Sequence, residues 1–228
     1  MSVTAPKIAG DEAQPRSYAF SNTLVALARE PSGTAESIRA LRTHIMAQHV
    51  QEGRRALAVC AATPGVGCTF VASNLAVALS QIGVKTLLID VNMRNPGIDR
   101  LFQPAHTVEG LQQCLMASDT SFGDYIDEEV LPDLSIMYAG GVAANPQELL
   151  ATDRFSELMN FCLRDYDMTI IDTPPANSCS DVHRVSTVVG YAMIVTRRDK
   201  TRVSDLKTLV SELREDRARV VGTVMTEV

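Results

Sequence analysis

Short apolar runs alternate with longer stretches of helical periodicity along most of this 228-residue chain. Continuous apolar runs are typical of strands buried on both faces, and the helical stretches between them are typical of crossover connections. The pattern predicts an α/β fold with a doubly wound, mostly parallel sheet. The expected strands are residues 56–61, 85–90, 134–138, 168–172, 191–196 and 220–225, and the expected helices are residues 34–49, 69–82, 110–116, 146–150, 154–164, 180–188 and 203–214.

The first 31 residues show little periodicity and contain three prolines. We expect residues 1–31 to be a loosely ordered leader and residues 32–228 to form a single domain. The leader lacks the basic-then-apolar layout of a signal peptide. No apolar run approaches the ~18 residues of a membrane span, so we expect that the chain does not cross a bilayer by itself. The scattered cysteines favour a reducing cytoplasm as its location.

Charge and cysteine usage exclude two classes of function. The net charge is −6, which argues against a surface that coats nucleic acid. The five cysteines are scattered and form no CxxC pair, which argues against a disulfide framework or a zinc ribbon. Four of them are expected to be small apolar core residues. Cys68 differs because of the motif in which it lies.

Residues 62–69, ATPGVGCT, follow the frame of a phosphate-binding loop, GxxxxGK[ST], between an expected strand and an expected helix. Glycines let successive backbone N–H groups curl around an anion, toward which the helix N-terminus directs its dipole. Two positions depart from the frame: Ala62 replaces the first glycine and Cys68 replaces the lysine. The alternative is an ordinary tight strand-to-helix turn. The candidate nucleotide-binding residues are Pro64, Gly65, Val66, Gly67, Cys68 and Thr69 of this loop, together with Arg94.

Two further strands are expected to end in an acidic residue, Asp90 in TLLIDVNMRNP and Asp172 in YDMTIIDTPP. A glycine loop and two acids at neighbouring strand ends are the layout of a nucleotide site at the carboxyl edge of a parallel sheet. Thr69, Asp90 and Asp172 are therefore the candidate ligands for Mg²⁺.

Five segments in this order resemble the cytoplasmic domain of the bacterial tyrosine kinases (BY-kinases), deviant-Walker P-loop ATPases related to ParA and MinD. The segments are ESIRALRTHI, TPGVGCTFVASNLAVAL, LLIDVNMRNP, YAGGVAANPQELL and YDMTIIDTPP, and the resemblance spans residues 24–228. It implies a P-loop NTPase fold, ATP or ADP with Mg²⁺ as cofactors, and catalytic roles at Asp90, Asn92 and Asp172.

Three departures imply a degenerate member of this family. The first departure is Cys68 in place of the phosphate-loop lysine. Loss of one charged hydrogen-bond partner of phosphate costs on the order of 1.5–3 kcal/mol, roughly 10- to 150-fold in affinity. The second acid of the family motif, which would act as a base, is Asn92, and losing a general base costs ~10²–10⁴-fold in rate. The sequence reaches Val228 without the family's tyrosine-rich tail. We expect nucleotide to be held weakly or not at all, and a pseudokinase rather than an efficient kinase.

Several alternatives remain open at this stage. Arg94 or Lys200 would partly replace the missing charge if either reached the nucleotide, and the chain would then be an active ATPase or tyrosine autokinase with a rearranged site. A third hypothesis is that the chain is a positioning ATPase of the MinD or ParA type. Cys68, at a helix N-terminus, would have a lowered pKa if it served as a redox switch.

The resemblance also implies partners. Glu36, Arg39 and Arg42 match the family's E-x-x-R-x-x-R helix, whose role is a subunit contact that builds a ring. The alternative is a solvated face with weak i,i+3 pairing. We expect self-association, no nucleic acid, and a separate membrane-embedded polysaccharide co-polymerase that holds the chain at the inner membrane. Its task would be to regulate or scaffold the export of capsule, exopolysaccharide or a holdfast-type polymer.

Overall fold

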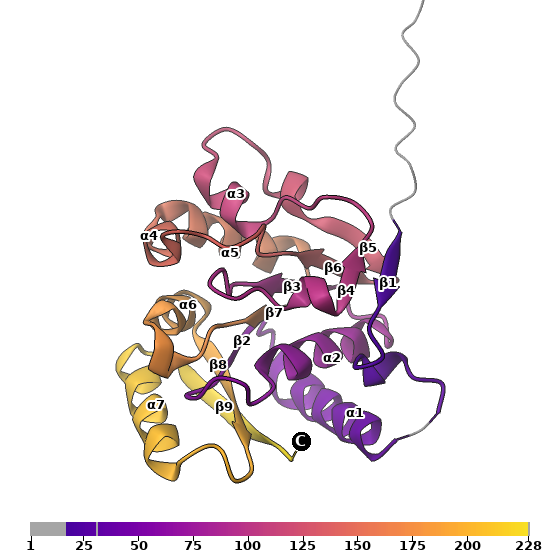
Figure 1. Cartoon of the computed structure of the whole chain (residues 1–228), viewed down its shortest axis with the longest axis vertical. Helices are drawn as coiled ribbons and strands as arrows, with labels where there is room; N and C mark the ends of the chain where they lie inside the picture. The colour runs from indigo at the N-terminus through magenta and orange to yellow at the C-terminus, as the bar shows by residue number, and fades with distance from the viewer. Residues whose placement is uncertain (1–16, 31, 228) are drawn as a thin grey trace, which may run out of the picture.

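A computed structural model describes residues 17–30 and 32–227 of the chain. A seven-stranded sheet crosses the molecule in the order β5-β6-β3-β7-β2-β8-β9, and every neighbouring pair is parallel except β5 with β6 (Figure 1). The strands of this sheet are β2 (Ala56–Cys60), β3 (Thr86–Asp90), β5 (Asp127–Leu131), β6 (Leu134–Met137), β7 (Met168–Asp172), β8 (Tyr191–Arg197) and β9 (Arg219–Thr226).

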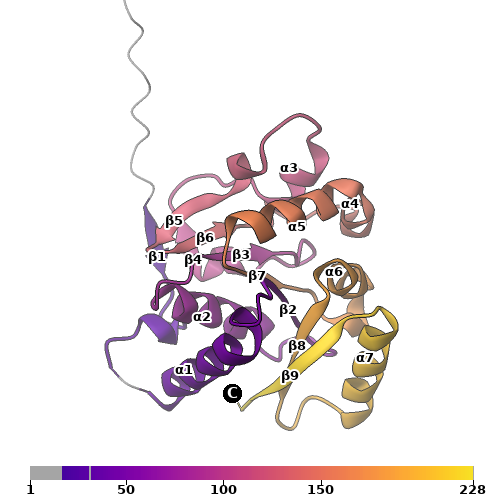
Figure 2. The ribbon, with the colours of Figure 1, turned by 180° about the vertical axis from the view of Figure 1, so that it is seen from behind.

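Helices cover both faces of the sheet (Figures 1 and 2). The α-helices are α1 (Gly33–Ile45), α2 (Cys68–Ser80), α3 (Leu111–Met116), α4 (Pro146–Ala151), α5 (Asp153–Asp165), α6 (Asp181–Val189) and α7 (Val203–Glu215). Shorter turns of helix are η1 (Val25–Leu27), η2 (Met46–Val50), η3 (Ile98–Arg100), η4 (Phe122–Tyr125) and η5 (Ala176–Ser178).

Successive side chains of the central strand β2 enter two separate hydrophobic cores. Ala56, Ala58 and Cys60 pack with residues of α3 and α5 to α7, whereas Leu57 and Val59 pack with residues of α1 and α2. Side chains alternate between the two faces of a strand, so a strand that is apolar at every position requires a core on each side. This is the doubly wound arrangement that the apolar runs predict.

The predicted α/β fold with a mostly parallel sheet is confirmed, and each expected strand and helix corresponds to an observed one. The expected helix 34–49 divides into α1 and a π-helical turn, η2. The antiparallel edge strand β5, with sequence DEEVL, was not expected because it has no apolar run. None of the helices in the described ranges has both the length and the apolarity needed to cross a bilayer.

The N-terminal segment differs from the expected loose leader 1–31. Residues 1–16 and 31 of that leader lie outside the described residues, but residues 17–30 pack against the domain. β1 (Tyr18–Phe20) pairs with β4 (Phe102–Pro104) in a small antiparallel sheet, and Leu24 is buried. The buried amide of Asn74 in α2 holds this segment, because it accepts from the Ala26 N–H at 3.0 Å and donates to the Thr23 carbonyl at 3.2 Å.

Candidate functional site

The phosphate-binding frame forms the loop between β2 and α2, at the carboxyl edge of the sheet. Gly65 and Gly67 have φ values of 68° and 96°, in the left-handed region that favours glycine, and Gly67 caps the start of α2. The loop borders a cavity of about 420 Å³. Its lining includes Thr63, Pro64, Gly65, Val66, Gly67, Cys68, Thr69, Asn92 and Arg100. The loop residues predicted from the motif therefore share one cleft.

Thr69, which lines this cleft, contacts the buried Asp172. Thr69 Oγ1 donates to Asp172 Oδ2 at 2.6 Å. The other carboxylate oxygen, Oδ1, is buried and has no hydrogen-bond partner in the described part of the chain. Burial raises the pKa of Asp172 well above its ordinary value, and the negative charge of the nearby Asp90 adds a smaller effect in the same direction. The hydrogen bond from Thr69 lowers the pKa of Asp172. An orphaned carboxylate oxygen beside a hydroxyl is a donor set that suits Mg²⁺.

A buried hydroxyl in the lining of this cleft, that of Thr63, is also without a hydrogen-bond partner. Thr63 Oγ1 has no partner within residues 17–30 and 32–227. Among the same residues, no group of three or more His, Cys, Asp or Glu side chains is arranged to hold a metal. Mg²⁺ is usually held by one or two carboxylates, water and the phosphates of its ligand. Thr69 and Asp172 thus fit a metal that arrives with a nucleotide.

Asp90, the last residue of β3, is buried beside its register partner Asp172 on β7, but the Asp90 carboxylate has three donors. Oδ1 accepts from the Asn92 N–H at 3.0 Å, and Oδ2 accepts from the N–H groups of Gly97 and Ile98 at 2.9 and 3.1 Å. Burial still raises the pKa of Asp90 despite these bonds. The contacts make Asp90 the anchor of the loop that follows β3.

Asn92 shapes the same loop with its side chain. Its Oδ1 accepts from the Asn95 N–H at 3.2 Å, and the residue lines the cleft. A carboxamide has no proton-accepting pair of useful basicity, so Asn92 can orient a ligand but cannot serve as a general base.

Cys68 is the first residue of α2 and lies half-buried in the wall of the cleft. Burial raises the pKa of Cys68 well above its ordinary value, and the neighbouring Asp172 and Cys60 act in the same direction. The lowered pKa that a redox switch requires is therefore absent.

The two cations proposed to replace the missing lysine lie in different places. Arg94 Nε and Nη2 donate to the buried carboxylate of Asp181 at 2.9 and 3.1 Å, and Arg94 does not line the cleft. Lys200 Nζ donates to the carbonyl of Gly65 at 3.2 Å. The structure therefore brings Lys200 to the phosphate loop and gives Arg94 a different partner.

Sequence reasoning missed four residues around the cleft. Thr23 and Arg100 line it, Arg197 Nη1 donates to the Gly65 carbonyl at 3.4 Å, and Thr226 Oγ1 donates to the Val66 carbonyl at 2.8 Å. These residues come from the N-terminal segment, η3, β8 and β9. None of them belongs to a local motif, and only the polar Asn74 within an apolar helix signalled that a segment docks there.

The E-x-x-R-x-x-R residues lie along α1. Arg39 and Glu36 form an exposed ion pair at 2.8 Å, with side chains 41% and 73% exposed. Arg42 turns inward, where Nη1 donates to the Ala78 carbonyl of α2 at 3.4 Å. Two of the three motif residues thus remain available on the surface, and the third holds α1 against α2.

Comparison with known proteins gives consistent matches. The family described as "AAA domain" matches residues 54–218. The putative tyrosine-protein kinase CapB of Staphylococcus aureus is 30% identical over 87% of this chain and 86% of its own length. The putative tyrosine-protein kinase EpsB of Ralstonia nicotianae is 32% identical over 83% of this chain, which corresponds to only 25% of that longer relative.

Solved structures also match this chain over most of its length. The chimerical protein CapA2B2 superposes with a TM-score of 0.81 at 28% identity, over 90% of both chains. The kinase domain of the Escherichia coli tyrosine kinase ETK superposes with a TM-score of 0.82 at 29% identity, over 90% of this chain and 80% of that one. MinD of Pyrococcus horikoshii, solved with Mg-ADP, shares the fold, with a TM-score of 0.54 at 20% identity over 75% and 69% of the two chains.

Proposed function

The chain belongs to the bacterial tyrosine kinase family, and we propose that it is a degenerate member which binds Mg-nucleotide weakly and regulates or scaffolds polysaccharide export. The observation that carries the proposal is the contact between Thr69 and Asp172. Asp172 keeps one carboxylate oxygen without a hydrogen-bond partner among the described residues, which suits a metal ion. The adjacent phosphate loop has Cys68 at the position of the family's lysine.

The residues of the cleft have separable roles. The backbone N–H groups around Gly65 and Gly67 and the start of α2 hold phosphates. Thr69 and Asp172 would hold Mg²⁺, which when bound neutralises phosphate charge and orients it. Asp90 and Asn92 fix the neighbouring loop. Neither Cys68, which stays a neutral thiol, nor Asn92 supplies the charge or the base that efficient transfer to tyrosine needs.

The partner proposal rests on the family. The match to the chimera named CapA2B2 supports a separate membrane-embedded co-polymerase as partner, with this chain at the inner membrane through it. We propose that Glu36 and Arg39 contribute to a contact between copies of the chain, because they remain exposed on α1. Capsule, exopolysaccharide or a holdfast-type polymer would be the exported product.

The test is calorimetric titration with Mg-ADP and Mg-ATP of the wild-type chain and of Cys68→Lys, alongside a tyrosine phosphorylation assay. We expect Cys68→Lys to tighten nucleotide binding about 10- to 150-fold, since it restores one charged hydrogen bond. Cys68→Ala is the matched control and leaves affinity near that of wild type. Phosphorylation of tyrosine should stay near background unless Asn92→Asp is added.

Efficient phosphorylation by the wild-type chain would overturn the proposal and establish the second candidate, an active ATPase or tyrosine autokinase. One contact favours that candidate, the bond from Lys200 Nζ to the Gly65 carbonyl. If Lys200 replaces the lost lysine, Lys200→Ala should weaken Mg-nucleotide binding at least about tenfold, whereas Arg94→Ala should not. Unchanged affinity in Lys200→Ala would exclude this replacement.

A further inference from the structure

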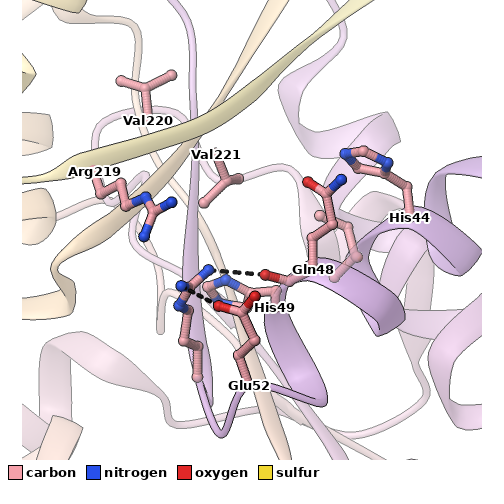
Figure 3. A pocket seen from close by; sticks show the side chains of 9 residues that line it. His44, Gln48, His49, Glu52, Arg219, Val220 and Val221 are labelled. Carbon is pink, nitrogen blue, oxygen red and sulfur yellow. Dashed lines mark hydrogen bonds and ion pairs between the residues drawn. The ribbon is translucent and has the colours of Figure 1, made fainter.

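The last strand of the sheet, β9, connects two different parts of the molecule. Its first residues, Arg219 to Val221, line a cavity of about 330 Å³ beside η2 (Figure 3). Its last residue, Thr226, instead contacts the phosphate loop. The carboxyl end of β9 is therefore part of the surroundings of the nucleotide cleft, although no motif marks it in the sequence.

The Thr226 side chain contacts one peptide group of the phosphate loop from both ends. Its Oγ1 lies 2.8 Å from the Val66 carbonyl and 3.2 Å from the Thr196 carbonyl. A hydroxyl has a single proton, so the shorter contact, to Val66, is the main hydrogen bond. A side-chain carbon at Gly67 would lie 3.5 Å from the methyl carbon of Thr226. The hydroxyl and the methyl group thus lie against the two residues that share the peptide group between positions 66 and 67.

The backbone of Thr226 is itself fixed by the sheet. It pairs in register with Arg197 of β8, and its carbonyl accepts from the Arg198 N–H at 2.9 Å. The preceding loop carbonyl, that of Gly65, also accepts from this side, since Lys200 Nζ donates to it at 3.2 Å. Two successive carbonyls of the phosphate loop therefore face the carboxyl ends of β8 and β9.

The direction of the Val66 carbonyl determines the direction of the next N–H group. A trans peptide group is planar, so its C=O and N–H bonds point in opposite directions. Because the Val66 carbonyl points to Thr226, the Gly67 N–H points away from β9. Gly67 lines the nucleotide cleft, and its N–H has no acceptor within residues 17–30 and 32–227. An unpaired N–H in an anion-binding loop is a donor for a phosphate oxygen.

We propose that Thr226 is a positioning residue of the phosphate loop, which keeps the Gly67 N–H directed toward the phosphates of a bound nucleotide. The inference rests on the nucleotide binding proposed above. Backbone N–H groups carry more of the phosphate binding in this loop, because Cys68 replaces the lysine. Without the Thr226 hydroxyl, the peptide group between positions 66 and 67 is free to rotate. The affinity then falls in proportion to the fraction of molecules in which this donor is turned away.

The test is calorimetric titration with Mg-ADP of the whole chain and of three variants of β9. Thr226→Val keeps the shape and the methyl group but removes the hydroxyl, and we expect roughly 2- to 12-fold weaker binding, the loss of one neutral hydrogen bond. Thr226→Ser keeps the hydroxyl and removes the methyl group, so it should bind nearly as tightly as wild type. The matched control, Thr223→Val, makes the same chemical change at an exposed position of the same strand and should have no effect.

Amide NMR distinguishes a positioning role from a general loss of structure. Titration with Mg-ADP should shift the Gly67 amide strongly in wild type and in Thr226→Ser, and less in Thr226→Val. The Val221 amide, at the other end of β9, is the internal reference (Figure 3). Its resonance in the free protein should be the same in all of these chains, whereas a disrupted β9 would change it.

The same variants in the Cys68→Lys chain separate this inference from the proposed function. If neither wild type nor Cys68→Lys binds Mg-ADP at millimolar concentration, the proposed nucleotide binding fails, and the role of Thr226 fails with it. If either chain binds and its Thr226→Val variant binds equally well, only the positioning role is overturned. The positioning role is also overturned if Thr226→Ser weakens binding as much as Thr226→Val, or if the Gly67 shift is the same in both.

Discussion

Asp90 and Asp172 end neighbouring parallel strands and face each other in register, yet their hydrogen-bonding states are opposite. Asp90 accepts three backbone N–H groups from the loop that follows its strand. Asp172 accepts one hydroxyl, from Thr69, and keeps a buried oxygen without a partner among the described residues. Two acids that look equivalent in sequence thus differ, because Asp90 anchors a loop whereas Asp172 keeps the oxygen that we propose binds a metal.

This difference in hydrogen bonding separates a structural role from a proposed ligand-binding role. A carboxylate saturated by backbone N–H groups maintains the fold whether or not nucleotide binds. A carboxylate with an orphaned oxygen costs folding free energy, which a cation can recover. The orphaned oxygen of Asp172, next to Thr69, therefore supports the proposed metal binding, whereas the saturated carboxylate of Asp90 does not.

The largest expected effect is on stability at Asp90. Asp90→Asn replaces one acceptor oxygen by an N–H₂ group that faces backbone donors, so we expect the free energy of unfolding to fall by about 3 kcal/mol. Urea denaturation with far-UV circular dichroism measures this loss. Exposed Asp119→Asn is the control and should stay within about 0.5 kcal/mol of wild type. A loss at Asp90 no larger than the control would contradict the role of anchor.

The second effect is on ligand binding at Asp172. Asp172→Asn should weaken Mg-ADP binding roughly 10- to 150-fold and leave binding of metal-free ADP nearly unchanged, because only the metal needs the carboxylate. Calorimetry with Mg²⁺ and with excess EDTA separates the two. Equal weakening under both conditions would mean that Asp172 does not hold the metal.

The third effect is the pH dependence of stability without Mg²⁺. Burial, with Asp90 nearby, raises the pKa of Asp172, so the folded chain binds a proton that the unfolded chain has lost. From the ordinary Asp pKa up to the raised folded pKa, stability falls as pH rises, by up to about 1.4 kcal/mol per pH unit for one proton. Asp172→Asn should reduce this slope, and its stability relative to wild type should increase with pH. Parallel pH profiles of the two chains would refute the assignment.

The smallest effect on stability is expected at the solvent-exposed Glu36–Arg39 pair. Glu36 serves as an exposed acid with which the buried Asp90 and Asp172 can be compared. Glu36→Gln should change the free energy of unfolding by at most about 0.5 kcal/mol, because solvent screens the pair. Light scattering on the same variant reports self-association. A large stability loss would mean that the pair supports the fold rather than a contact between copies.

The sequence alone predicted the sheet and most of its helices, because uninterrupted apolar runs such as those of β2, β3 and β7 must be buried on both faces. It did not predict β5, whose polar DEEVL sequence pairs only at the sheet edge, nor the pairing of β1 with β4. β1 forms because it pairs with a strand more than 80 residues away, and β5 forms because it adds to the edge of the sheet. The local periodicity of the sequence predicts neither pairing.

At the cleft, the sequence alone determined the glycine loop, Thr69 and the two acids, since each motif is a local requirement of a strand end or a helix start. Only the tertiary structure decided which acid is saturated, that Asp181 binds Arg94, and that Lys200 reaches Gly65. The physical reason is that a side chain's partner is chosen by distance and donor geometry in space. The residues that complete this site come from segments that only folding brings together.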